Sequence, residues 1–377
     1  MAFTFIHTAD WQLGKSFGQF PDAQAGPLRE ARIEVISRIA KAAAEEGATH
    51  IFVAGDVWDS AIPSNTTLRQ PLTVMGETPE VIWWLLPGNH DPDGADGLWD
   101  RVEEIAPKNV RVFREPNPVE IEAGVSLLPA PWQRIQHGQD LTAWMDLAKT
   151  PPGNLRIGLA HGAVKGFGTE GDTDREVIPP TRAETARLDY LALGDWHGRS
   201  AINSKTHYSG TPEPDRHKMG ARGQVLLVTV GAGPEPLIRE IPTAKYDWPV
   251  LSLKLQPDEI GASLEVLENR LSEGQPLRRT HVRLDVSGGV TVADWTVFEA
   301  RINALRGDCA SLQLRGETDV NIVVVPEDID ALDAQGSVRD AAQDLLNRRN
   351  DEDLSKLDRD IASEALQILL RYGAETA

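Results

Sequence analysis

Five short polar segments of the sequence carry aspartate, asparagine and histidine residues that could together hold metal ions. Their polar residues are Asp10, Asp56, Asn89 with His90 and Asp91, His161, and Asp195 with His197. Two hard divalent ions bridged by one carboxylate can clamp a phosphoryl group during an in-line displacement, and these residue types suit such ions. Because the chain has a single cysteine, Cys309, the ligands must be nitrogen and oxygen atoms. The pattern indicates metal-assisted phosphoester chemistry.

Each polar segment follows a short apolar run that is typical of a buried strand. These runs are Phe3–His7, His50–Ala54, Val81–Leu86, Leu155–Ala160 and Tyr190–Leu193, and two further runs are Val110–Phe113 and Val125–Leu128. Apolar residues recur at helical spacing over Pro27–Ala44, which predicts a helix. Alternating strands and helices predict a layered α/β domain, and ligands bind at the carboxyl ends of strands in α/β sheets. We therefore expect the polar segments to converge at one edge.

A second structural unit is predicted to begin near residue 246. Strand and helix patterns alternate up to about residue 325 and predict a small α+β domain. The remaining segment is acidic and ends in a helical pattern with one apolar stripe, formed by Leu354, Leu357, Ile361, Ala365, Ile368 and Tyr372. We predict three parts, at residues 1–245, 246–325 and 326–377.

Composition and charge narrow the functional classes. Hydrophobic residues make up 41% and charged residues 25% of the 377 residues, as in ordinary globular proteins. The net charge is −19, which is the wrong sign for binding nucleic acid by bulk electrostatics alone. The first residues carry no basic signal-peptide region, and every apolar run is too short to cross a membrane. We expect a cytoplasmic protein with no membrane partner.

The polar segments resemble, in order and context, the calcineurin-like metallophosphoesterase superfamily. The matching motifs are Asp10, Gly55-Asp-Val-Trp-Asp59, Gly88-Asn-His-Asp91, His161-Gly162 and Gly194-Asp-Trp-His197. Three further runs are similar to the Mre11/SbcD-type DNA repair nuclease subunit, namely Ile6 to Gly14, Pro129-Ala-Pro-Trp132 and His207-Tyr-Ser-Gly-Thr-Pro212. The resemblance covers residues 1 to about 245. It implies an α/β fold with a β-sandwich flanked by helices, followed by a small capping domain and a helical C-terminal tail.

The resemblance implies two divalent metal ions, Mn²⁺ or alternatively Mg²⁺, and a role for each matching residue. Asp10 and His197 would bind the first ion, Asn89 and His161 the second, and Asp56 both. His90 would be the catalytic histidine, which could donate a proton to the leaving oxygen, and Asp91 could hold its ring in place.

Two positions depart from the family pattern. Gln12 stands where the family usually has histidine, and Asp195 stands where it has the first histidine of Gly-His-x-His. Each ion therefore loses one expected imidazole. A glutamine oxygen is a weak ligand, whereas a carboxylate suits Mn²⁺ and Mg²⁺ well. We expect the first site to be the weaker one.

The resemblance also implies macromolecular partners. DNA would be the substrate, and an SMC-like coiled-coil ATPase of the Rad50/SbcC type would bind the C-terminal region, where the apolar stripe could equally dock on this protein itself. A homodimer is implied by resemblance as well. Just after the Ser-Gly-Thr-Pro turn, Arg216, Lys218 and Arg222 form a locally basic stretch that could approach DNA phosphates, although a solvated loop explains it equally well.

Two alternatives stay open. The first is an enzyme of the same superfamily that acts on a small phosphoester. The second is a non-catalytic scaffold subunit in which Gln12 and Asp195 have weakened metal binding. The protein-phosphatase branch fits less well, because Asp59 is followed by Ser60 rather than Arg-Gly, and His90 by Asp91 rather than Glu.

Overall fold

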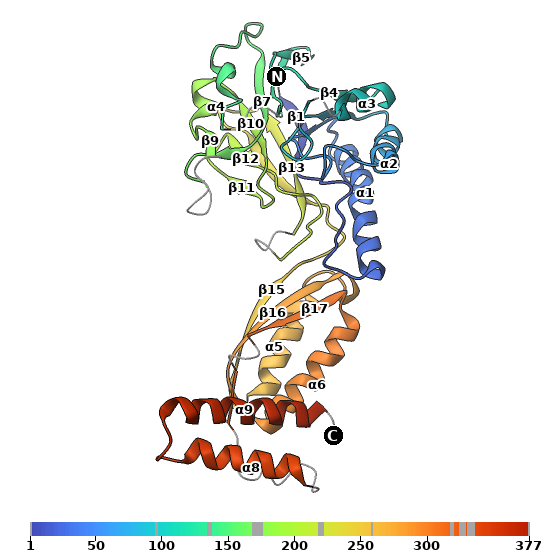
Figure 1. Ribbon diagram of the computed structural model, residues 1–377. Helices are drawn as coiled ribbons and strands as arrows, with labels where there is room; N and C mark the ends of the chain where they lie inside the picture. The colour runs from blue at the N-terminus through green and yellow to red at the C-terminus, as the bar shows by residue number, and fades with distance from the viewer. Residues whose placement is uncertain are drawn as a thin grey trace. The chain divides into compact units, whose positions relative to one another are not determined.

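The computed structural model describes residues 2–94, 97–133, 138–167, 176–217, 222–257, 259–316, 320–323, 329 and 336–375. Contacts between residues divide the chain into two compact units, Met1–Trp248 and Pro249–Ala377 (Figure 1). The first unit contains the predicted metal-binding residues, and the second contains the predicted capping domain and tail.

The first sheet of unit 1 has six strands in the order β14-β13-β1-β2-β3-β4. Their bounds are β1 Phe3–Thr8, β2 His50–Val53, β3 Ile82–Leu85, β4 Val110–Val112, β13 Gln224–Val230 and β14 Leu237–Pro242. β1 to β4 run parallel, while β13 is antiparallel to β1 and to β14. The carboxyl ends of β1, β2 and β3 therefore meet at one edge of this sheet.

The second sheet of unit 1 also has six strands, in the order β11-β12-β10-β7-β6-β5. Their bounds are β5 Val119–Glu122, β6 Val125–Ala130, β7 Leu155–His161, β10 Tyr190–Gly194, β11 Ser200–Ala201 and β12 Thr206–Tyr208. The four central strands are parallel, and the two edge strands are antiparallel to their neighbours. A separate pair of short strands, β8 Ala163–Val164 and β9 Glu176–Ile178, follows β7.

The two sheets face each other across a core of buried aromatic and aliphatic side chains. Phe5 and Phe52 of the first sheet share this core with Ile157 and Tyr190 of the second. A second cluster lies between the first sheet and its helices, which are α1 Asp22–Glu45, α2 Asn65–Gly76 and α3 Leu98–Ile105. A third lies outside the second sheet, beside η1 Ala143–Asp146 and α4 Arg182–Thr185. Unit 1 is thus a β-sandwich flanked by helices, as predicted (Figure 1).

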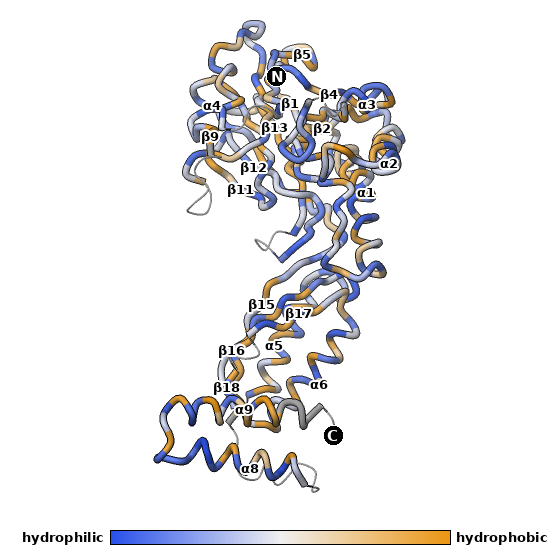
Figure 2. Tube along the Cα trace, viewed as in Figure 1, coloured by the Kyte–Doolittle hydropathy of each residue, from blue (hydrophilic) through white to orange (hydrophobic). Residues whose placement is uncertain are grey.

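Unit 2 is built on a four-stranded sheet whose long strand β16 pairs in parallel with β15, β17 and β18. The elements are β15 Val250–Leu255, α5 Ile260–Ser272, η2 Leu277–Arg279, β16 His281–Thr291, α6 Val292–Asp308, β17 Ser311–Arg315, β18 Val320–Val323, α8 Ser337–Asn350 and α9 Lys356–Glu375. Along α5 and α6, hydrophobic residues alternate with hydrophilic ones (Figure 2). The predicted α+β order of strands and helices is confirmed.

The C-terminal helices share the core of unit 2. Ala342 and Leu346 of α8 and Leu366 and Leu370 of α9 belong to one hydrophobic cluster with residues of α5, α6 and β16. The predicted roles of residues 246–325 as a capping domain and of residues 326–377 as a docking region stay predictions. Within the described residues, no helix combines the length and the apolar character needed to cross a membrane.

Candidate metal centre

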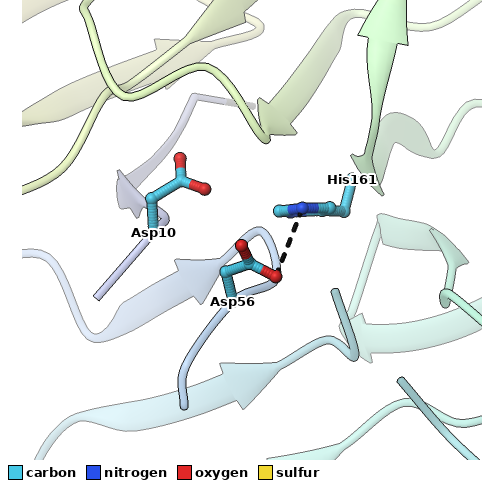
Figure 3. Close-up of side chains that lie close together, drawn as sticks. All are labelled: Asp10, Asp56 and His161. Carbon is cyan, nitrogen blue, oxygen red and sulfur yellow. Dashed lines mark ion pairs between the residues drawn. The ribbon is translucent and has the colours of Figure 1, made fainter. Parts of the chain in front are cut away.

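Three buried side chains gather where strands of both sheets end. Asp10 follows β1, Asp56 follows β2, and His161 closes β7 (Figure 3). One potential ligand atom from each lies within 4.8 Å of the other two. Nε2 of His161 is 3.4 Å from Oδ1 of Asp56. The predicted convergence of these three residues is therefore present in the structure.

The backbone turns sharply at these strand ends. Asp10, Asp56 and Asp195 all have positive φ angles, of 57°, 54° and 100°. Aspartate tolerates this left-handed region better than most residues, and such strained positions are common at functional sites. Glycine is required where chains approach closely: a Cβ on Gly88 would lie 2.3 Å from the backbone nitrogen of Asp56. The local sequence therefore brings the loops together around the carboxylates.

Backbone hydrogen bonds hold the carboxylates in place. The Asp195 N–H donates to Oδ1 of Asp10 at 3.0 Å, which ties the loop after β10 to the loop after β1. The His90 N–H donates to Oδ1 of Asp56 at 2.9 Å. Nδ1 of His161 is 2.8 Å from the Ala54 carbonyl oxygen, so its N–H donates there. Nε2 of His161 consequently faces the carboxylates.

The buried carboxylates of the cluster would be stabilised by a bound cation. Burial raises the pKa of Asp10 well above its ordinary value, and the charges of Asp56 and Asp195 raise it further. Burial by itself lowers the pKa of His161, but the surrounding carboxylates, led by Asp56, raise it to about 9. Buried like charges are costly unless an opposite charge accompanies them. A divalent ion would supply that charge.

The donor atoms present fit a hard divalent ion. Carboxylate oxygens and one imidazole nitrogen come from the three clustered residues, and two other predicted ligands lie beside them. Oδ1 of Asp195 is 3.8 Å from Nε2 of His161. The Asn89 side-chain amide reaches the same nitrogen at 2.8 Å; rotated by 180°, its nitrogen donates to both Asp56 oxygens at 3.2 Å. Oxygen-rich sets of this kind suit Mn²⁺ or Mg²⁺.

Gln12 and His197 face each other. Nε2 of Gln12 is 3.1 Å from Nε2 of His197, and Oε1 of Gln12 accepts a hydrogen bond from Lys15 at 3.0 Å. Burial lowers the pKa of His197 to about 4, and the positive charge of Arg216, whose guanidinium is 3.1 Å from Nδ1, contributes to the lowering. Both residues therefore already have polar partners.

His90 and Asp91 have different surroundings. The exposed His90 ring has Nε2 3.9 Å from Oδ2 of Asp56 and Nδ1 3.9 Å from Oδ1 of Asp59. Asp91 is buried, and its carboxylate accepts hydrogen bonds from the backbone N–H groups of Gly88 at 2.7 Å and Trp58 at 3.0 Å. We predicted that Asp91 holds the His90 ring, whereas the structure has its carboxylate holding the backbone of the loops that follow β2 and β3.

An ion cluster beside the centre was not predicted from the sequence. The buried Asp215 carboxylate pairs with Lys15 at 2.5 Å, Arg32 at 3.1 Å and Arg216 at 3.4 Å. A pocket of about 290 Å³ is lined by residues of this cluster and of the centre, namely Gln12, Lys15, His90, Asp195, Trp196, His197, Thr211, Pro214, Asp215 and Arg216. The pairs with Lys15 and Arg32 join residues about 200 positions apart, and nothing in the local sequence indicates such pairing.

Of the three predicted DNA-contacting residues, one lies at the pocket. Arg216 lines the pocket, next to His197. Arg222 is exposed just before β13, and Lys218 lies outside the described residues. Trp11 and Trp58, which neighbour predicted ligands in the sequence, are buried in the core between the first sheet and its helices.

Comparison with known proteins identifies the class to which this fold and site belong. The sequence model of the calcineurin-like phosphoesterases matches residues 3–197, just over half of the chain. The chain therefore belongs to the calcineurin-like phosphoesterase family, and phosphoester hydrolysis that depends on divalent metal is its reaction class.

Among the solved structures that are similar to this chain are a bacterial and a plant protein. The protein TT1561 of Thermus thermophilus is 12% identical with a TM-score of 0.40, and the match covers 64% of this chain and 99% of that one. Purple acid phosphatase PPD1 from yellow lupin (Lupinus luteus) seeds is 11% identical with a TM-score of 0.43, and the match covers 64% of this chain and 52% of that one.

Proposed function

We propose that the chain is a Mn²⁺-dependent DNA phosphodiesterase, the exonuclease or endonuclease subunit of a cytoplasmic DNA repair complex. The observation that carries this proposal is the buried cluster of Asp10, Asp56 and His161 beside a pocket lined by His90 and cationic side chains. The sequence resemblance to the Mre11/SbcD type supplies the substrate class.

Each residue of the centre has a proposed task. Asp10, Asp56, Asn89, His161 and Asp195 would hold divalent metal. A bound ion would polarise the phosphoryl group and offset its negative charge. The exposed ring of His90 lines the pocket, where it can donate a proton to the leaving oxygen. Asp91 would act indirectly, because its hydrogen bond to Gly88 positions the loop that carries Asn89 and His90.

Cationic side chains at the pocket could contact the phosphates of a nucleic acid. Three cations, Lys15, Arg32 and Arg216, surround the single carboxylate of Asp215. Of these cations, Lys15 and Arg216 line the pocket, together with the carboxylates of Asp195 and Asp215. Phosphate binding depends on such local cations, so the overall charge of −19 weakens DNA affinity without opposing the chemistry. The isolated chain should bind DNA poorly at ordinary salt.

The proposed partner is an SMC-like coiled-coil ATPase of the Rad50/SbcC type. Three residues of the predicted apolar stripe are exposed on α9: Leu357 is 68%, Ile361 56% and Ile368 46% accessible to solvent. The opposite residues Ala362 and Leu366 are buried in unit 2. An exposed apolar face of this kind suits helix packing against a partner. A partner that supplies basic surface would also compensate for the acidity of this chain.

The test is Mn²⁺-dependent cleavage of labelled linear duplex and single-stranded DNA by the purified chain, with a small phosphodiester assayed in parallel. Asn89→Ala removes a proposed ligand, and Asn303→Ala on α6 is the matched control outside the centre. We expect slow DNA cleavage that Asn89→Ala abolishes and Asn303→Ala retains. Rapid cleavage at ordinary salt without a partner would contradict the charge argument.

The pocket also favours a second candidate, a phosphodiesterase or phosphomonoesterase for a small substrate. A volume of about 290 Å³ is close to the lower end of the range for small-molecule sites. Hydrolysis of the small diester together with no cleavage of DNA, with or without the ATPase, would establish this candidate. No hydrolysis of either substrate by the complete complex would instead favour the scaffold.

A further inference from the structure

The glutamine that stands where the family usually has a histidine has two polar neighbours in this chain. Oε1 of Gln12 accepts from the Lys15 ammonium group at 3.0 Å. Nε2 of Gln12 is 3.1 Å from Nε2 of His197. The amide oxygen is the only atom of glutamine that binds a metal ion well. An ion bound to this oxygen would therefore share it with the Lys15 ammonium group.

Lys15 is fixed in this position by a strong ion pair. Its Nζ lies 2.5 Å from Oδ2 of Asp215, whose side chain is almost completely buried. Arg32, also buried, pairs with the same oxygen at 3.1 Å and donates to the Trp11 carbonyl oxygen. The Asp215 carboxylate therefore anchors the ammonium group against the centre, and Lys15 is not a freely moving surface side chain.

An ammonium group and a metal ion bound to one amide oxygen repel each other. The Lys15 nitrogen is 3.0 Å from Oε1 of Gln12, and a divalent ion on that oxygen would lie a few ångströms from a full positive charge. In a partly buried site such repulsion is only weakly screened. The Lys15 charge therefore opposes metal binding beside Gln12.

The other side of the centre shows the opposite arrangement. His161 donates from Nδ1 to the Ala54 carbonyl oxygen, which leaves Nε2 directed at the Asp56 carboxylate and the Asn89 amide. Asp195 adds another carboxylate 3.8 Å away. A hydrogen bond from the second ring nitrogen is what orients metal-binding histidines in proteins. The donor atoms of His161, Asp56 and Asp195 are therefore already oriented towards one another.

We propose that the centre binds one divalent ion firmly, within the cluster of Asp10, Asp56 and His161, and a second only weakly, because Lys15 competes for the Gln12 oxygen. Lys15 is thus a residue that controls metal occupancy, anchored by Asp215. The second ion binds when its concentration is high or when Lys15 is drawn away from Gln12. The inference rests on the metal centre and is independent of whether the substrate is DNA.

The first test is the stoichiometry of Mn²⁺ on the full chain. The metal-free protein is titrated by calorimetry, and its Mn²⁺ content is measured after dialysis against micromolar Mn²⁺. We expect one tightly bound ion per chain and a second binding step at least about a hundredfold weaker. The electron paramagnetic resonance spectrum of the dialysed protein should be that of isolated Mn²⁺. Two equally tight ions with a coupled dinuclear spectrum would overturn the proposal.

The second test separates Lys15 from the other ligands. Lys15→Met removes the charge, and the second step should tighten about tenfold or more, as expected for losing one unit charge a few ångströms from the ion. Lys41→Met is the matched control: it removes the same charge from an exposed position on α1, where Lys41 pairs with Glu45 at 3.7 Å. If the second Mn²⁺ ion binds with the same affinity to the wild type and to Lys15→Met, the proposed role of Lys15 is wrong.

A third variant does not depend on the folding of Lys15→Met. Gln12 has a φ of 44°, and histidine is among the residues that tolerate this backbone region. Gln12→His supplies an imidazole in place of the amide, so two ions should remain after dialysis and their spectrum should show coupling. A single ion in Gln12→His would contradict the proposal. None of these measurements uses DNA, so loss of the nuclease assignment would leave their outcome unaffected.

Discussion

His161 donates its Nδ1 hydrogen to the carbonyl oxygen of Ala54, across 2.8 Å and between the two sheets of the sandwich. This bond connects the end of β7 in the second sheet to the segment that follows β2 in the first. It also determines which ring nitrogen faces the carboxylates, because Nδ1 is occupied. The orientation of the His161 ring is therefore fixed by a backbone group, as is usual for histidines that bind metal.

Metal binding should release a proton from His161. The pKa of about 9 means that metal-free His161 is protonated at neutral pH, and Nε2 must lose its hydrogen to bind an ion. The affinity for Mn²⁺ should therefore rise by up to about tenfold per pH unit from neutrality towards the pKa, and level off above it. Calorimetry in buffers of different ionisation enthalpy would measure the release. An affinity that does not change with pH would contradict this expectation.

Asp56→Asn should separate metal binding from folding. The asparagine oxygen can still accept the His90 N–H, while the negative charge that raises the pKa values of Asp10 and Asp91 is removed. Without metal, the variant loses both the repulsion between Asp56 and its neighbouring carboxylates and the attraction between Asp56 and protonated His161, so its stability should stay close to that of the wild type. The increase in melting temperature that Mn²⁺ produces in the wild type should disappear. Thermal unfolding with and without Mn²⁺ measures both quantities.

Gly88→Ala should damage the centre through a steric clash. The added Cβ would lie 2.3 Å from both the nitrogen and Oδ1 of Asp56, so the loop after β3 must move. We expect a loss of about 2 kcal/mol or more of unfolding free energy and a large loss of Mn²⁺ affinity. Gly261→Ala is the control, since its Cβ has no neighbour within 4 Å and lies in α5. Equal Mn²⁺ affinity in both variants would argue against this account.

Much of the fold follows from the sequence because apolar runs and helical spacing are local signals. Every predicted strand of unit 1 is present, and β1, β2 and β7 end beside Asp10, Asp56 and His161 as the rule for parallel sheets requires. Helix α1, however, begins at Asp22 rather than at Pro27. A proline in the second turn loses only one backbone hydrogen bond, and the packing of Ala25 and Leu28 outweighs that loss.

Other features could not be predicted from the sequence because they depend on contacts between residues that are far apart along the chain. The partners of the Asp91 carboxylate are backbone N–H groups, which have no sequence pattern. The pairing of Lys15 with Asp215 joins the two ends of unit 1. On α9 both Ile361 and Leu366 recur at helical spacing with other apolar residues, yet only Leu366 is buried. Periodicity identifies apolar faces, but the tertiary structure decides which one is covered.

Asp215 should contribute stability that depends on pH. Burial opposes ionisation of its carboxyl group, but Arg32 and Lys15 lower the pKa from 3.8 to about 2. Because the folded-state pKa is depressed, this contribution is complete above pH 3.8 and is lost as the pH falls towards 2. At neutral pH it amounts to about 2 kcal/mol.

Asp215→Asn should therefore lower the free energy of unfolding by about 2 kcal/mol or more at neutral pH, since it also leaves the buried Arg32 without its charged partner. The difference from wild type should shrink as the pH falls below 3.8. Urea unfolding at several pH values measures this difference, with the exposed Asp344→Asn on α8 as the control. A difference that stays constant across this range would show that the ion pairs of Asp215 do not stabilise unit 1.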